Sequence, residues 1–210
     1  MKSSLTLEDL KSIFAALERV MADNFQLLTD LDAVAGDGDL GITMTKGFAA
    51  ANKAATSYAE NDAGKLLMLA GMSIAREAPS TLGTLLATGL MRAGKEVTGR
   101  DALTLEDTIK MLNALINGIM ERGKAQPGEK TIIDALLPAR DALQSAGAEV
   151  TMSEAWRAAA KAAEAGLEAT RQMKAVHGRA AYRGENSVGM VDPGATVGVM
   201  LIKAIAEAAR

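Results

Sequence analysis

Apolar side chains recur every three or four residues along most of this chain, which is the spacing of the buried face of an amphipathic helix. The first such segment carries Leu10, Ile13, Phe14, Leu17 and Met21 at that spacing. Sustained alternation with β-branched residues, which would indicate strands, is not visible. The pattern predicts eight helices, which span residues 6–29, 40–57, 63–76, 81–97, 105–122, 131–145, 153–176 and 193–210.

Several of these helices have a recognisable start. Thr104-Leu-Glu-Asp107 resembles a capping box with Asp in place of the usual Glu. Asp192-Pro193 puts a capping residue before a proline at the first helical position. No Pro/Ser-rich linker or internal repeat divides the chain. We therefore expect one all-α domain over residues 1–210, built as an antiparallel helix bundle.

Composition narrows the chemistry that this domain can perform. Hydrophobic residues make up 49% of the 210 positions, enough for a sizeable core. The net charge of −3 disfavours nucleic acid as a main partner, since that use needs a basic surface. With no cysteine and one histidine, His177, the chain cannot form disulfides, cysteine-ligated zinc or a poly-histidine site. It shows no signal-peptide core or membrane-length apolar run, so we expect a cytoplasmic protein with no membrane partner.

The most distinctive stretch is a glycine-rich segment between the first two predicted helices. Asp32, Asp37 and Asp39 place three carboxylates within eight residues, with glycines between and after them. Crowded carboxylates repel one another, and a hard divalent cation relieves that repulsion. An EF-hand is excluded, because its required glycine and glutamate positions, counted from Asp37, hold Ile42 and Phe48. The segment predicts an Mg²⁺ site shared with phosphates; the alternative is a set of ordinary helix caps in a solvated loop.

Other segments could supply donors for such phosphates. The run Ser80-Thr81-Leu82-Gly83-Thr84 offers hydroxyls and amides at a predicted helix N-terminus, which attracts anions, although such a run taken alone is more often a plain N-cap. Arg179 and Arg183 could contact a phosphate in bidentate fashion. The standard glycine-rich nucleotide motifs are missing.

Four blocks of sequence together resemble one known family. They are Gly36-Asp-Gly-Asp-Leu-Gly41 followed by Lys46-Gly-Phe48, residues 122–134, Gly178-Arg-Ala-Ala-Tyr-Arg-Gly-Glu-Asn-Ser-Val-Gly189, and Asp192-Pro-Gly-Ala-Thr196. In this order and over nearly the whole length, the chain is similar to the L subunit of dihydroxyacetone kinase, which is the nucleotide-binding subunit. The resemblance implies an eight-helix antiparallel barrel that binds ADP or ATP at one rim with two Mg²⁺ ions.

The resemblance also implies roles for particular residues. Asp32, Asp37 and Asp39 match the metal ligands, and no other side chain is implied to react. The positions that match nucleotide contacts are Leu40, Gly41, Ile42, Thr43, Thr81, Leu82, Gly123, Ile132, Arg179, Asp192, Pro193 and Gly194. Ser80 is a further candidate, as a replacement for the displaced serine of the family's loop. Two departures lie near the expected phosphates: Leu40 replaces a common histidine, and residues 78–83 replace the loop Gly-Gly-Ala-Ser-Gly-Pro.

The expected reaction is phosphoryl transfer to a small ketose, which in the family is dihydroxyacetone. There, a separate K-type subunit holds the ketose through a histidine. His177 matches no such role. The stand-alone form resembles the branch in which a phosphohistidine carrier of the phosphotransferase system recharges bound ADP, and the chain could also form a homodimer. The alternatives are a subunit that exchanges free ATP and a non-catalytic nucleotide-binding adaptor.

Overall fold

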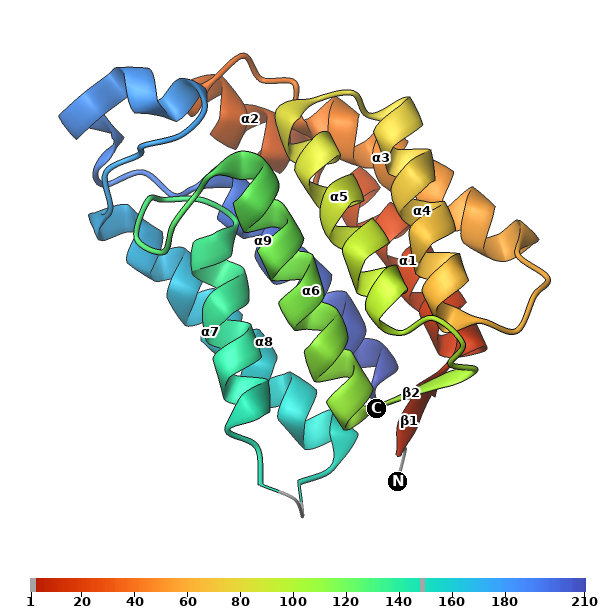
Figure 1. The fold of residues 1–210 in the computed structure, drawn as a ribbon. Coiled ribbons are helices and arrows are strands. Elements are labelled where there is room, and N and C mark those ends of the chain that lie inside the picture. The colour runs from red at the N-terminus through yellow and green to blue at the C-terminus, as the bar shows by residue number, and fades with distance from the viewer. Residues whose placement is uncertain (1–2, 148–149) are drawn as a thin grey trace.

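The computed structural model describes residues 3–147 and 150–210, and these are mostly helical (Figure 1). The α-helices in this part of the chain are α1 (Leu7–Asp23), α2 (Phe25–Ala35), α3 (Leu40–Ser57), α4 (Ala63–Glu77), α5 (Thr81–Glu96), α6 (Leu105–Gly123), α7 (Ile133–Gln144), α8 (Met152–Ala169) and α9 (Pro193–Ala208). Two 3₁₀ segments, η1 (Thr170–Gln172) and η2 (Arg179–Ser187), precede α9. Two short strands, β1 (Ser4–Thr6) and β2 (Ala102–Thr104), complete the fold.

Eight of the helices form a closed antiparallel ring. Going around it, α1 contacts α3, each helix from α3 to α8 contacts its successor, and α9 contacts both α8 and α1. The short helix α2 lies at one end of this ring and packs on α3 (Figure 1). The predicted all-α, single-domain, eight-helix antiparallel barrel is thus confirmed. Since neighbours alternate in direction, α3, α5, α7 and α9 all begin at the same end of the barrel.

Small residues let neighbouring helices approach closely. A Cβ on Gly64 of α4 would lie 2.3 Å from the carbonyl oxygen of Gly94 of α5, so only glycine fits this crossing. Large side chains fill the rest of the interior, with Phe48, Ile116 and Trp156 all at most 1% exposed. This packing holds the helix ends of the barrel in fixed positions relative to one another.

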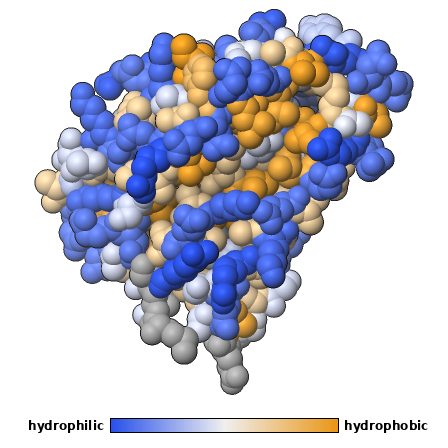
Figure 2. Space-filling model, turned by 180° about the vertical axis from the view of Figure 1, so that it is seen from behind, coloured by the Kyte–Doolittle hydropathy of each residue, from blue (hydrophilic) through white to orange (hydrophobic). Residues whose placement is uncertain are grey.

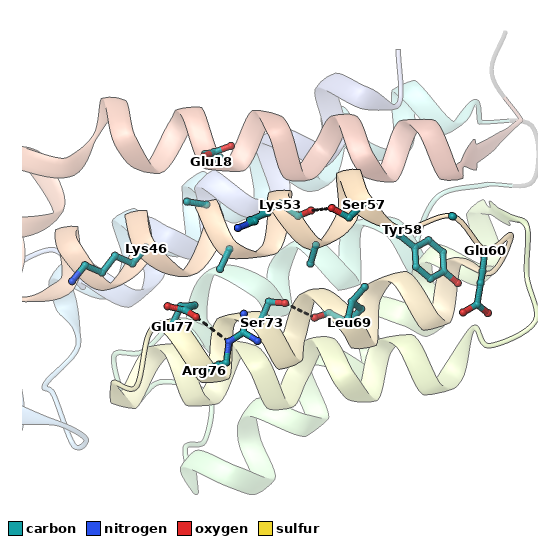
Figure 3. A pocket seen from close by; sticks show the side chains of 14 residues that line it. Glu18, Lys46, Lys53, Ser57, Tyr58, Glu60, Leu69, Ser73, Arg76 and Glu77 are labelled. Atoms are coloured by element: carbon teal, nitrogen blue, oxygen red, sulfur yellow. Dashed lines mark hydrogen bonds and ion pairs between the residues drawn. The ribbon is translucent and has the colours of Figure 1, made fainter.

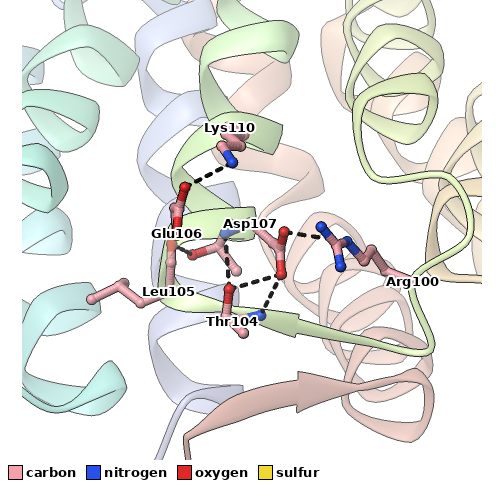
Figure 4. A network of polar contacts seen from close by, with 7 residues as sticks. Arg100, Thr104, Leu105, Glu106, Asp107 and Lys110 are labelled. Carbon is pink, nitrogen blue, oxygen red and sulfur yellow. Dashed lines mark hydrogen bonds and ion pairs between the residues drawn. The ribbon is translucent and has the colours of Figure 1, made fainter.

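Local capping signals set the predicted helix starts correctly. The Thr104 side chain accepts a hydrogen bond from the amide of Asp107, and the Asp107 carboxylate accepts from the Thr104 amide, which is a full capping box (Figure 4). Arg100 lies 3.5 Å from the same carboxylate and ties the preceding turn to it. This network lies at the end of the barrel opposite α2, beside the strand pair in which Leu5 faces Leu103.

Three expectations about the elements are wrong. The helix predicted over 6–29 is two helices, α1 and α2, which are separated at Asn24, where both the backbone amide and the side-chain amide donate to the Val20 carbonyl. As a result Asp32 lies on α2 rather than in a loop. The helix predicted over 153–176 ends at Ala169, and the short strands β1 and β2 were not anticipated.

The surface is unevenly polar. Seen from behind, hydrophilic residues cover much of the molecule, while hydrophobic residues gather over its upper part (Figure 2). No helix among the described residues is long and apolar enough to cross a bilayer.

Candidate functional site

A cleft of about 880 Å³ opens at the end of the barrel where α3, α5, α7 and α9 begin. Helix N-termini present unpaired amides and a positive dipole end, so this end of the barrel attracts anions. Of the residues predicted to bind metal or nucleotide, those that line the cleft are Asp32, Asp37, Asp39, Leu40, Ser80, Thr81, Leu82, Gly123, Ile132, Arg179, Asp192, Pro193 and Gly194.

The three aspartates come together at the mouth of the cleft. One carboxylate oxygen from each of Asp32, Asp37 and Asp39 lies within 4.8 Å of the other two. Asp32 is held by the Leu40 amide, which donates to its Oδ2 at 3.2 Å. Gly36 leaves room for this carboxylate, since a Cβ there would lie 2.9 Å from Asp32 Oδ1. The glycine-rich turn therefore brings a helical side chain and two loop side chains to one point.

Charge is crowded at this point. The pKa of Asp39 is raised, first by partial burial and then by the negative charges of Asp37 and Asp32, and Arg179 acts in the opposite direction. Arg179 also forms an ion pair with Asp37 at 2.7 Å. Asp39 begins α3 but makes no side-chain capping bond, so its carboxylate is available to a ligand.

The donor set fits Mg²⁺. Three carboxylates supply only oxygen ligands, and Mg²⁺ typically takes one or two carboxylates, several waters and substrate phosphates. Octahedral Mg²⁺ at about 2.1 Å from its ligands needs oxygen pairs about 3 to 4 Å apart, which a small inward movement of Asp37 and Asp39 would give. Both side chains are exposed, and the exposed guanidinium of Arg179 that pairs with Asp37 would have to move with it.

The start of α5 forms the opposite wall of the cleft. Ser80 caps this helix, because its Oγ accepts from the Gly83 amide at 3.1 Å. The next two amides, those of Thr81 and Leu82, have no acceptor within the helix. This arrangement offers two N–H donors to an anion, and the Ser80 hydroxyl can still donate its hydrogen while its oxygen accepts the cap bond.

The start of α9 forms a third wall. Asp192 Oδ2 accepts from the Ala195 amide at 2.7 Å, so Asp192 caps α9 as predicted. Burial raises the pKa of Asp192 to about 7, although the Ala195 amide and Lys130 favour its charged form. A Cβ on Gly194 would lie 3.4 Å from the Ile132 amide nitrogen. The first turn of α9 and the start of α7 are therefore in close contact along the cleft.

Comparison with known proteins assigns a family to this site. The sequence model of the DAK2 domain matches residues 34–207. The chain belongs to the DAK2 domain family. The DAK2 chain is 34% identical, over 91% of each protein, to the ADP-binding subunit DhaL of the PEP-dependent dihydroxyacetone kinase of Escherichia coli (strain K12). This confirms the resemblance to L subunits.

Larger kinases also contain a region similar to this DAK2 chain. It is 40% identical to L-erythrulose 1-kinase of Mycolicibacterium smegmatis over 94% of its own length, but spans only 35% of that protein. The dihydroxyacetone kinase of C. freundii, solved in complex with AMP-PNP and Mg²⁺, superposes with a TM-score of 0.71 at 27% identity. The superposition covers 94% of the DAK2 chain and 33% of the larger one. These relatives are named as kinases, so the DAK2 chain belongs to a family of phosphotransferases.

Some predicted nucleotide-binding residues do not line the cleft. Gly41, Ile42 and Thr43 follow Leu40 on α3 and are not among the residues that line the cleft. Gly41 packs against α2, where a Cβ would lie 2.4 Å from the Phe25 carbonyl oxygen. Its role in this structure is the close crossing of α2 and α3, and that crossing fixes where Leu40 and Asp39 lie.

Sequence reasoning also missed residues that line the cleft, among them Lys130, Thr131 and His177. His177 Nε2 lies 2.5 Å from Oε2 of Glu129, so it joins two of the surrounding loops. Lys130 is buried beside Asp192, at 4% exposure. No short sequence motif predicts the contact of His177 with Glu129 or that of Lys130 with Asp192, because both join segments that are distant in sequence.

A second groove of about 1110 Å³ lies elsewhere, between α1, α3 and α4 (Figure 3). Lys46, Lys53 and Glu77 lie along it, together with alanines of α3. None of the predicted metal or nucleotide residues lines this groove. Its lining lacks a carboxylate cluster and helix N-termini, so the aspartate cleft is the candidate site.

Proposed function

We propose that this chain is the nucleotide-binding subunit of a kinase that acts on dihydroxyacetone or a related small ketose. The observation that carries the proposal is the trio Asp32, Asp37 and Asp39 at the mouth of a cleft surrounded by helix N-termini. Cation ligands and anion donors face the same space, which is what a metal–phosphate complex needs. The E. coli relative, matched over 91% of both chains, is named an ADP-binding subunit.

In this proposal the aspartate trio holds two Mg²⁺ ions against the nucleotide phosphates. The ions would neutralise charge on the transferred phosphoryl group. Arg179 adds a guanidinium beside Asp37, and Thr81 and Leu82 line the cleft at the start of α5, where their amides would donate to a phosphate. Gly123, Ile132 and the turn Asp192-Pro193-Gly194 would line the rest of the nucleotide.

The protein's contribution to the transfer is positioning. The γ-phosphoryl group moves from ATP to a ketose hydroxyl, whose proton leaves as the new ester forms. A cleft that fixes the phosphates favours this in-line reaction without a covalent intermediate on the L-type subunit.

A separate K-type subunit would bring the ketose to this cleft. Large apolar side chains are exposed on the segments around the aspartates, as expected for a docking surface. They are Phe25, Leu27, Val34, Ile42, Val176, Tyr182 and Val188, with Tyr182 94% exposed. The PEP-dependent relative in E. coli, matched over 91% of both chains, favours recharging of bound ADP by a phosphocarrier.

Reconstitution tests the proposal. The purified chain is mixed with a K-type subunit, dihydroxyacetone and Mg²⁺, with either ATP or a phosphohistidine carrier plus catalytic ADP as the phosphoryl source. We expect dihydroxyacetone phosphate in the carrier arm and its loss with Asp37→Ala. Full activity of Asp37→Ala would contradict the metal assignment, and turnover with free ATP alone would favour the exchanging form.

Leu40 favours one second candidate, a nucleotide-binding adaptor without transfer activity. It begins α3 and is 6% exposed, so this position gives the cleft an apolar side chain where the family commonly has histidine. Tight ADP binding with no transfer to dihydroxyacetone or erythrulose in either arm would favour the adaptor.

A further inference from the structure

Lys130 is an unusual residue for the place it occupies. It is 4% exposed, and its backbone has a left-handed φ of 61°, a conformation that glycine adopts far more easily. Burying an ammonium group is also unfavourable unless polar partners surround it. A glycine at this position would adopt the left-handed conformation without strain and would bury no charge. The presence of lysine therefore indicates that its ammonium group has a role here.

The ammonium group of Lys130 joins segments that are far apart in the sequence. Its Nζ donates to the carbonyl oxygen of Thr170 at 2.7 Å and to that of Met190 at 2.5 Å. Thr170 follows the end of α8, and Met190 precedes the start of α9. The Thr170 hydroxyl in turn accepts from the Asp192 amide at 3.2 Å. One buried side chain thus connects the loop before α7 with the entry to α9.

Both connected segments form a wall of the cleft. Thr131 and Ile132 follow Lys130 directly, and Asp192 and Gly194 face them. A Cβ on Gly194 would approach the Ile132 amide nitrogen to 3.4 Å, and one on Gly198 would approach Ile132 Cγ1 to 3.1 Å. Contacts this tight tolerate only a few tenths of an ångström of movement before the wall changes shape.

Electrostatics supports the same arrangement. Burial lowers the pKa of Lys130, while the nearby Asp192 carboxylate favours its charged form. Lys130 in turn favours the charged form of Asp192, the residue that caps α9. Without the ammonium, the two carbonyls would lose a buried donor and Asp192 would lose its compensating charge.

The barrel itself does not depend on this one side chain. Asp134 separately holds the loop, accepting from the amides of Gly128 at 2.6 Å and Thr131 at 2.7 Å. Helices α7, α8 and α9 also pack on one another directly. Loss of the ammonium should therefore loosen the wall while leaving the helices in place.

We infer that Lys130 is a positioning residue, whose buried ammonium group fixes the wall formed by Ile132 and the Asp192–Gly194 turn against the nucleotide. This inference rests on the proposed function, because it takes the ligand of the cleft to be a nucleotide. It assigns Lys130 no direct part in the phosphoryl transfer.

The test compares Lys130→Met, which keeps the length of the side chain but removes the charge, with Lys65→Met as a matched control. Lys65 is an exposed lysine of α4 that pairs with Glu60. With Mg²⁺ present, we expect ADP to dissociate at least tenfold faster from Lys130→Met and at the wild-type rate from Lys65→Met. Amide hydrogen exchange without ligand should accelerate at Ala195 and Thr196, whose amides bond to Asp192, and stay unchanged in α4.

Rescue separates positioning from general loss of packing. The chain has no cysteine, so Lys130→Cys can be alkylated with bromoethylamine in urea and refolded, which regenerates a lysine-like ammonium at this site alone. Wild-type protein carried through the same steps is the control. Restoration of slow ADP release and slow exchange at Ala195 supports the inference.

The remaining outcomes would contradict either this inference or the proposed function. An unchanged ADP release rate in Lys130→Met overturns the inference. So does a barrel that unfolds, or that exchanges faster throughout, in both Lys130→Met and the unmodified Lys130→Cys, because Lys130 would then be purely structural. If wild-type protein binds no ADP, the proposed function fails instead, and the exchange rates at Ala195 and Thr196 still decide whether Lys130 fixes this wall.

Discussion

Replacing Asp39 by asparagine should make the metal-free protein more stable while abolishing its metal-dependent uptake of ADP. Asn has almost the shape of Asp and is an equally good residue at a helix start, so α3 should begin where it does now. The substitution removes one of three negative charges at the mouth of the cleft and leaves the other two in place. Function and stability are therefore expected to change in opposite directions.

The size of the stability gain follows from the spacing of the charges. The carboxylate oxygens lie within 4.8 Å of one another, where two unit charges repel by about 1 kcal/mol in bulk water and by about 3 kcal/mol at an effective dielectric constant near 20. Asp39 is exposed, so the lower figure applies to each of its two neighbours. The guanidinium of Arg179 offsets part of this repulsion. A net gain of about 1 kcal/mol remains, which is about 2 to 4 °C in melting temperature for a chain of this size.

Urea and thermal unfolding at low ionic strength measure this gain, first with a chelator and then with Mg²⁺ and ADP. At a ligand concentration 100 times Kd, wild-type protein should gain about 2.7 kcal/mol, and Asp39→Asn should gain almost nothing. Asp101→Asn, an exposed aspartate near β2, controls for the change in net charge. An Asp39→Asn protein that is less stable than wild type without metal, or that is stabilised equally by Mg²⁺ and ADP, would refute the reasoning.

Three further predictions test other parts of the site. Arg179→Gln removes the cation that pairs with Asp37, so Mn²⁺ should bind several-fold more tightly without nucleotide, measured by electron paramagnetic resonance, while ADP binds more weakly; unchanged Mn²⁺ affinity would contradict the pairing. Gly41→Ala puts a Cβ at the crossing of α2 and α3 and should lower the free energy of unfolding by about 1 to 3 kcal/mol in urea. Asp192, with its pKa raised from 3.8 to about 7, binds its proton more tightly in the folded state, so its stabilising contribution is complete below about pH 4 and is lost as the pH rises through about 7. In urea, the free energy of unfolding of wild-type protein should fall by up to about 4 kcal/mol between pH 4 and pH 8, and Asp192→Asn should not show this fall. The same pH dependence in both proteins would contradict this.

Most of the fold could be predicted because its signals are local. The starts of α5, α6 and α9 depend on Ser80, Thr104 and Asp192, each of which caps the helix that follows it. The break at Asn24 could not be predicted, because the apolar periodicity continues across it. Only the packing of α2 over the end of the barrel requires the chain to turn there.

In the candidate site, too, the contacts that are local in sequence could be predicted and those between distant segments could not. The aspartate trio could be predicted because its three members lie within eight residues of the sequence, and in the structure their carboxylates lie close together as expected. The hydrogen bonds of Lys130 could not be predicted from the sequence, since its partners Thr170 and Met190 are 40 and 60 residues further along the chain. Such contacts depend on which helix ends meet in the barrel, and apolar periodicity carries no information about that.

Isothermal titration of wild-type protein with ADP, with Mg²⁺ and then with a chelator, tests the central claim most directly. We expect one ADP to bind each chain when Mg²⁺ is present, and at least tenfold weaker binding when the cation is removed. Absence of ADP binding in both titrations would contradict the account.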